Sequence, residues 1–176
     1  RDLHSFPTRR SSDLRFNSGK WTKIGVPSAG LVEGNTVVQI TGGHILTNVY
    51  GGNELTDVKG SCTVKMSGGT LGVPRTIDQI NTHPLTCYLF GAGKGDPRSH
   101  FNGMTNVGSV NVEVSGGIIY GSVFGGAEDG HVTGNVSVTI KKGESFKIGS
   151  TTYNDGPIIG TWESKIGRAV QQECRD

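Results

Sequence analysis

Apolar and polar residues alternate strictly in several short segments of the chain. Residues 110–114 read VNVEV, and residues 136–140 read VSVTI. A period of two places the valines and isoleucines on one face of a β-strand and the polar residues on the other. No segment of useful length shows the 3.6-residue period of a helix. The pattern therefore predicts an all-β fold of half-buried strands.

Glycine pairs separate these strands. The chain holds 29 glycines among 176 residues, well over the usual ~7 %. Glycine tolerates positive φ and close approach of another backbone, so many tight turns are expected. Each predicted strand is followed by a Gly-Gly corner, a second short strand and another Gly-Gly corner. The corners are 42–43, 68–69 and 116–117, and then 51–52 and 125–126.

The strands and corners belong to an internal repeat. Residues 108–140 match residues 34–66 without a gap, and a shorter period of 26 residues lies inside each block. Units start near Gly34, Gly60, Gly108 and Gly134. The second unit is longer because of an insertion near 73–105. Within it the repeat resumes at residues 88–93, YLFGAG, which echo the Val-Tyr-Gly-Gly and Val-Phe-Gly-Gly corners.

One such unit is too small to bury its apolar face alone, whereas stacked units share strand hydrogen bonds and cover one another's side chains. We therefore expect a parallel β-solenoid, β-helix-like, of about four coils over residues 34–164, preceded by a lead-in segment at 15–33. A β-sandwich built from hairpins is the competing architecture, because glycine-rich turns suit hairpins too. Cys62 falls on an inward strand position and is expected to be a small buried hydrophobe.

The two ends of the chain differ from the rest. Residues 1–14 read RDLHSFPTRRSSDL, and residues 165–176 read KIGRAVQQECRD. Both resemble translated sequencing adapters, so we expect them to be non-native and to make no ordered contact with the repeats. They hold six of the 17 basic and four of the 15 acidic residues, which leaves eleven of each sign in residues 15–164. A neutral balance removes the electrostatic argument for nucleic acid.

A resemblance to known proteins rests on residues 116–134, GGIIYGSVFGGAEDGHVTG. They resemble large glycine-rich repeat surface proteins of gut bacteria, which are adhesin-like and mostly hypothetical. The resemblance covers residues 34 to 160 and implies export and display at the cell surface or in the extracellular space. It implies no particular activity.

Three groups of residues are candidates for chemistry. Glu54 and Glu128 are repeat equivalents, with Asp129 and His131 near the second, and β-helix enzymes act on polysaccharides with grouped acids. A solvated corner is the competing interpretation. An aromatic strip could stack on sugars or only pack between coils; its members are Tyr50, Tyr88, Phe90, Phe124 and Trp162. The insertion near 73–105 is the place where a long loop would carry recognition.

Other motifs fail on spacing. Residues 91–96, GAGKGD, lack the Ser or Thr and the following helix of a phosphate-binding loop. The corners at Gly51 and Gly125 place glutamate where a calcium-binding nonapeptide needs glycine. His44, His83 and His100 have no metal-ligand spacing. Asn135 begins a glycosylation sequon, but on a predicted strand. We expect no catalytic, cofactor-binding or metal site.

The sequence thus favours a non-enzymatic structural or adhesive repeat segment of a bacterial cell-surface or secreted protein. Its expected partners are surface glycans or host and matrix proteins, without nucleic acid or a membrane span. The alternative is a fragment of a carbohydrate-active β-helix enzyme or its accessory domain. A groove with three converging acids would favour the enzyme, and a smooth face of Ser, Thr and Asn would favour adhesion.

Overall fold

The computed structural model describes residues 14–23, 30–74, 87–96, 105–142 and 145–160. Over these ranges the chain is all-β, as predicted, and contains no helix, so none that could cross a membrane. We predicted that residues 1–14 and 165–176 make no ordered contact with the repeats. Of these residues only Leu14 lies in the described part. Leu14 begins β1 (Leu14–Asn17), which forms an antiparallel hairpin with β2 (Lys20–Lys23).

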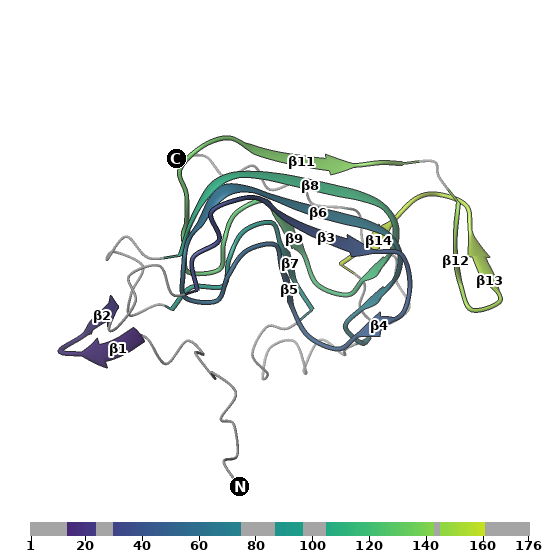
Figure 1. The fold of residues 1–176 in the computed structure, drawn as a ribbon. Coiled ribbons are helices and arrows are strands. Elements are labelled where there is room, and N and C mark those ends of the chain that lie inside the picture. Colours follow the sequence, from purple (N-terminus) through teal and green to yellow (C-terminus); the bar gives the residue numbers. More distant parts are fainter. Residues whose placement is uncertain (1–13, 24–29, 75–86, 97–104, 143–144, 161–176) are drawn as a thin grey trace, which may run out of the picture.

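The main sheet is built from parallel strands that are far apart in the sequence (Figure 1). Its strands are β3 (Thr36–Ile40), β6 (Val58–Leu71), β8 (Asn106–Ile119) and β11 (Val136–Ile140). Val38 is the register partner of Val64, Val64 of Val112, and Val112 of Val138. These are the residues that the internal repeat makes equivalent. The parallel pairing rules out the hairpin-built sandwich for this sheet, since hairpins give antiparallel neighbours.

Shorter strands extend each level of the sheet, and we call each level a rung. The first rung holds β3, β4 (His44–Ile45) and β5 (Val49–Tyr50); the second holds β6 and β7 (Leu89–Phe90); the third holds β8 and β9 (Val123–Phe124); the fourth holds β10 (His131–Val132), β11 and β14 (Ile158–Ile159). A second parallel sheet joins β5, β7 and β9 in that order. The repeat therefore does resume at Leu89 after the insertion. Residues 75–86 and 97–104 of the insertion lie outside the described part.

The expectation that glycine pairs interrupt the strands is wrong in the two inner rungs. β6 runs through Gly60 and through 68–69, and β8 runs through 116–117, with register irregularities at those points. Gly69 and Gly117 have φ of 83° and 96°. At these positions the two strands bend together (Figure 1), so they pair on both sides of the corner instead of ending there.

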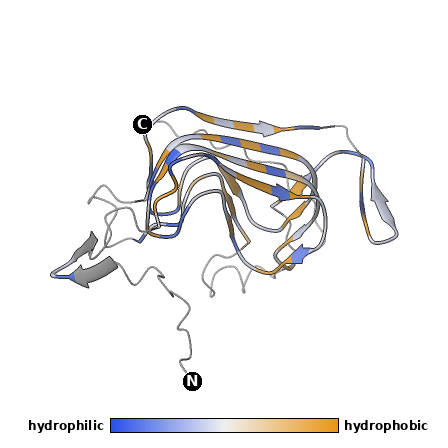
Figure 2. Cartoon of the chain, in the orientation of Figure 1, coloured by the Kyte–Doolittle hydropathy of each residue, from blue (hydrophilic) through white to orange (hydrophobic). Residues whose placement is uncertain are grey.

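Hydrophobic and hydrophilic residues alternate along β6 and β8 (Figure 2), and the burial of their side chains alternates with them. Cys62, Val64, Val112, Val114 and Ile119 are fully buried. The inward residues of the outer strands are less covered, because each outer strand has one neighbour among the described residues. Val136, for example, is 42 % exposed. Burial is therefore deepest where a rung lies between two others.

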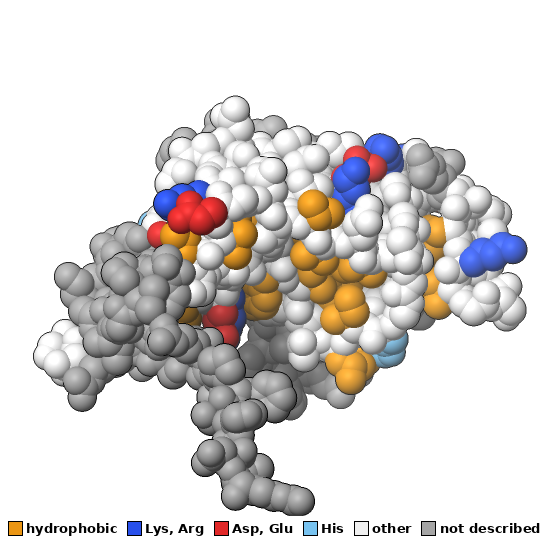
Figure 3. Space-filling view, in the orientation of Figure 1, with side chains coloured by type: hydrophobic (Ala, Val, Ile, Leu, Met, Phe, Trp, Pro, Cys, Tyr) orange, Lys and Arg blue, Asp and Glu red, His pale blue; other side chains and the backbone are white. Residues whose placement is uncertain are grey.

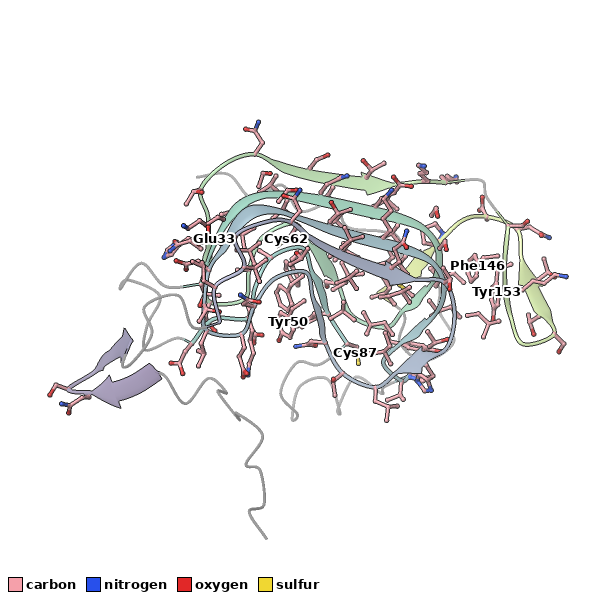
Figure 4. All side chains as sticks on the ribbon, viewed as in Figure 1. Glu33, Tyr50, Cys62, Cys87, Phe146 and Tyr153 are labelled. Atoms are coloured by element: carbon pink, nitrogen blue, oxygen red, sulfur yellow. The ribbon has the colours of Figure 1, made fainter. Side chains whose placement is uncertain are left out.

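A second hairpin interrupts the fourth rung. It pairs β12 (Phe146–Ile148) with β13 (Thr151–Tyr153), and the rings of Phe146 and Tyr153 stack with centroids 4.9 Å apart (Figure 4). The chain then returns to the main sheet, where β14 pairs with the end of β8 through Ile159 and Ile119. The hairpin is thus an insertion into a rung and not an additional one.

Candidate functional site

The aromatic residues predicted as a strip form a ladder through the second sheet. The rings of Tyr50 and Phe90 stack with centroids 5.2 Å apart, and those of Phe90 and Phe124 stack at 5.0 Å. Tyr88 meets Phe90 and Phe124 edge to face. Phe90 is buried, and the other three rings are half-buried. These rings stack on one another, as expected if the strip packs between coils instead of binding sugars. Trp162 lies outside the described residues.

The repeat-equivalent acids Glu54 and Glu128 lie near this ladder. Glu54 follows β5 and Glu128 follows β9, and Lys94 follows β7, which is the strand between them. Lys94 Nζ lies 2.9 Å from Glu54 Oε1, and this hydrogen bond raises the pKa of Lys94. Glu128 accepts a hydrogen bond from the Tyr50 hydroxyl, which in turn accepts one from Asn48. Burial and the hydrogen bond to Glu128 raise the pKa of Tyr50 to about 12. Each glutamate therefore has a partner within the protein.

Two aspartates near these glutamates also form hydrogen bonds between neighbouring rungs. Asp57 accepts hydrogen bonds from the backbone and side-chain nitrogens of Asn106, which joins the second rung to the third. The Asp129 amide donates a hydrogen bond to the carbonyl of Lys94, which belongs to the GAGKGD segment at residues 91–96. In the described ranges no three His, Cys, Asp or Glu side chains gather as metal ligands do.

A surface groove of about 510 Å³ lies between the Gly-Gly turns and the hairpin. His44, Thr70, Tyr120 and Lys147 contribute side chains to it. His44 Nε2 lies 2.7 Å from the Gly72 carbonyl oxygen, which holds the imidazole in place. No Asp or Glu is among the described residues that line the groove. The described part of its lining therefore offers no carboxylate pair of the kind that glycoside hydrolysis uses. His83 and His100 lie outside the described part.

The two cysteines of the described part, Cys62 and Cys87, are both buried. Cys62 lies inside the main sheet (Figure 4), as predicted, and burial raises the pKa of its thiol. A buried neutral thiol is a poor nucleophile and a poor metal ligand. Cys62 is accordingly a core residue.

The outward face of the main sheet carries two columns of mostly polar residues, with the exposed Val37 as the apolar exception. One column across the four rungs reads Val37, Thr63, Asn111 and Ser137, and the next reads Gln39, Lys65, Glu113 and Thr139. Except for Thr63 and Glu113, which are half-buried, these side chains are exposed.

Two contacts cross the edges of this outward face. Glu113 is paired at 2.8 Å with Lys141, which lowers the pKa of its carboxyl group. Ser61 donates to the Asn35 side chain from its amide, at 2.8 Å. These cross-rung contacts hold polar groups in place along the stacking direction.

The structure therefore separates the predicted candidates into three places. The aromatic ladder and the acids come together, and His44 lines the groove. Asn135 of the sequon is exposed and immediately precedes β11, so it is not on the strand as predicted. Sequence reasoning missed Lys94 as the partner of Glu54. Aligning residues 90–94, FGAGK, with residues 50–54, YGGNE, would have placed the lysine at that position. Comparisons with protein-family models, with curated proteins and with solved structures found no match for this chain.

Proposed function

We propose that this chain is a non-enzymatic structural or adhesive repeat segment of a bacterial cell-surface or secreted protein. In this proposal its rungs are coils of a parallel β-solenoid, about four in number. The support for the solenoid is the parallel pairing of repeat-equivalent residues in both sheets. Surface location and bacterial origin rest on the resemblance of the repeat sequence.

The observation that carries the proposal is the outward face of the main sheet. Apart from Val37, its columns present hydroxyl, amide and a few charged groups at the spacing of neighbouring strands, about 4.8 Å. A rigid array of this kind can make many weak hydrogen bonds to an extended polymer or a protein surface, and repetition multiplies such contacts. The expected ligands are surface glycans or host and matrix proteins.

The arrangement of the acids favours this function over a carbohydrate-active enzyme. A general acid or nucleophile must be free to reach a substrate. Glu54 is paired with Lys94, and Glu128 accepts a hydrogen bond from the Tyr50 hydroxyl. The groove, where a sugar would be enclosed, has no carboxylate among its described lining residues.

The test measures binding of the full chain to arrays of mucin-type and plant glycans and to matrix proteins. A variant with Thr63→Ala, Asn111→Ala and Ser137→Ala removes one polar column. We expect its affinity to fall at least about tenfold, which corresponds to about 1.4 kcal/mol. The matched control, Glu54→Ala with Glu128→Ala, removes the acids beside the ladder and should bind normally.

An assay for released sugar fragments tests the enzyme alternative. The proposal expects the same glycans to be recovered at full length after incubation with the chain. It would be overturned by cleavage that the Glu54→Ala and Glu128→Ala variant abolishes. If the variant that lacks the polar column still binds normally, the outward face is not the binding site.

A further inference from the structure

The two outer rungs present matching edges. On one side of β6 and β8 lie the five residues of β3 and the two of β4; on the other side lie the five of β11 and the two of β14. β3 starts opposite Cys62, which pairs with Val110, and β11 starts opposite Val110. Both edges therefore offer the same strand lengths at the same positions along the central strands.

Glycines show that the first rung has clearance for another backbone. In the inner rungs, a Cβ at Gly60 would lie 2.5 Å from the Gly34 oxygen, and one at Gly68 would lie 2.6 Å from the Thr41 oxygen. These glycines are needed because the preceding rung lies against them. Gly34 and Gly42 are their equivalents in the first rung, and a Cβ at either would meet nothing within 4 Å. Neither has a positive φ that would itself require glycine.

Apolar side chains are also left part-covered at both edges. Val38 and Ile45 of the first rung, and Val138 and Ile140 of the fourth, pack on the core but stay half-buried. Figure 3 shows hydrophobic side chains gathered on the face that carries the first rung. In the inner rungs the register equivalents of Val38 and Val138, which are Val64 and Val112, are fully buried. The inner valines are more buried because each inner strand has a parallel neighbour on both sides.

We propose that the first rung of one copy of this chain stacks on the fourth rung of a second copy, with β3 pairing parallel to β11 and β4 to β14. In-phase pairing places Val38 beside the partner's Val138 and Ile40 beside the partner's Ile140. The contact joins two different edges, so it is head-to-tail and can continue into short filaments. Unprotected edge strands in the described part make such strand addition favourable.

The fourth-rung edge can be blocked without touching the fold's own hydrogen bonds. Val110 donates its amide to Asn135, and the Lys141 amide donates to Val114. Because alternate residues of a parallel strand bond to the same neighbour, the Val136 amide faces away from β8. Proline at position 136 therefore removes a donor of the outer edge, where proline is tolerated.

Sedimentation analysis of the full chain over a range of concentrations tests the proposal. We expect reversible association that Gly42→Val abolishes at the first rung and Val136→Pro abolishes at the fourth. A mixture of the two variants should form a dimer and nothing larger, because each retains one intact edge. Gly126→Val, a matched control in equally open space at the corner after β9, should associate like the parent chain.

Three results would overturn the proposal. They are a parent chain that stays monomeric up to its solubility limit, a Gly42→Val variant that associates normally, and a mixture that does not form the dimer although both variants melt like the parent. If Val136→Pro unfolds the chain, Thr139→Lys with Val37→Lys places like charges across the proposed contact. That variant should then be monomeric. Ligand binding by the outward face does not depend on this contact.

Discussion

Phe90 and Phe124 stack face to face with ring centroids 5.0 Å apart, although they belong to different units of the repeat. The stacking joins β7 to β9 across the second sheet, where only two residues of each strand pair. Ring contact therefore adds to the backbone hydrogen bonds that continue past these short strands, such as those from the Gly91 amide to Phe124 and from the Ala92 amide to Gly126. It also ties the segment that follows the long insertion to the regular repeat.

Removing the central ring of this ladder should destabilise the whole stack. Phe90 is 6 % exposed and lies between Tyr50 and Phe124. We expect Phe90→Ala to lower the free energy of unfolding by about 3–5 kcal/mol, measured by urea denaturation. The control, Leu46→Ala, alters a side chain that is 63 % exposed, and its effect should stay within about 0.5 kcal/mol. Equal effects of the two variants would refute the ladder's role.

Alanine at two repeat-equivalent glycines should have opposite consequences. A Cβ at Gly60 would press on the backbone of the first rung, whereas one at Gly34 would enter open space. Gly60→Ala should cost about 1–3 kcal/mol through overpacking, and Gly34→Ala should be neutral or slightly stabilising. Thermal unfolding followed by circular dichroism at low protein concentration measures both. A neutral Gly60→Ala would argue against close stacking of the first two rungs.

The stack should lose stability in alkaline solution through Tyr50. Burial and the hydrogen bond to Glu128 raise its pKa from 10.0 to about 12. Because the folded chain holds the phenolic proton more tightly, this contribution is complete below pH 10 and is lost as the pH rises toward 12. Spectrophotometric titration of tyrosine should show a late component that Tyr50→Phe removes. Titration of all accessible tyrosines near their ordinary pKa would contradict the Tyr50–Glu128 contact.

Much of the stacking was predictable because the repeat encodes it directly. The alternation in residues 110–114 and 136–140 identifies the inward valines, and the 26-residue period identifies which of them become neighbours. The echo of the corner motif at Leu89 likewise predicts the return of the chain after the insertion. Period and alternation suffice here because a one-residue slip would turn every apolar side chain outward.

Other features depend on contacts that leave little trace in the sequence. β14 is two residues long and returns to the sheet after a hairpin, so no periodic pattern identifies Ile159 as a partner of Ile119. The continuous strands through Gly60 and through 68–69 follow from neighbouring strands that bend together. Each of these is decided by tertiary packing and not by local preference.

Engineered cysteines across two rungs test the in-register stacking most directly. Thr63 and Asn111 are register partners on the outward face, separated by the whole insertion. Neighbouring strands lie about 4.8 Å apart, within the range of Cα separations that a disulfide spans. After mild oxidation, peptide mapping should find Thr63→Cys joined to Asn111→Cys in most of the protein. In the matched pair, Thr63→Cys with Ser115→Cys, the partner lies four residues further along β8, about 13 Å away, and no bond should form. A bond in the second pair, or in neither, would contradict the account.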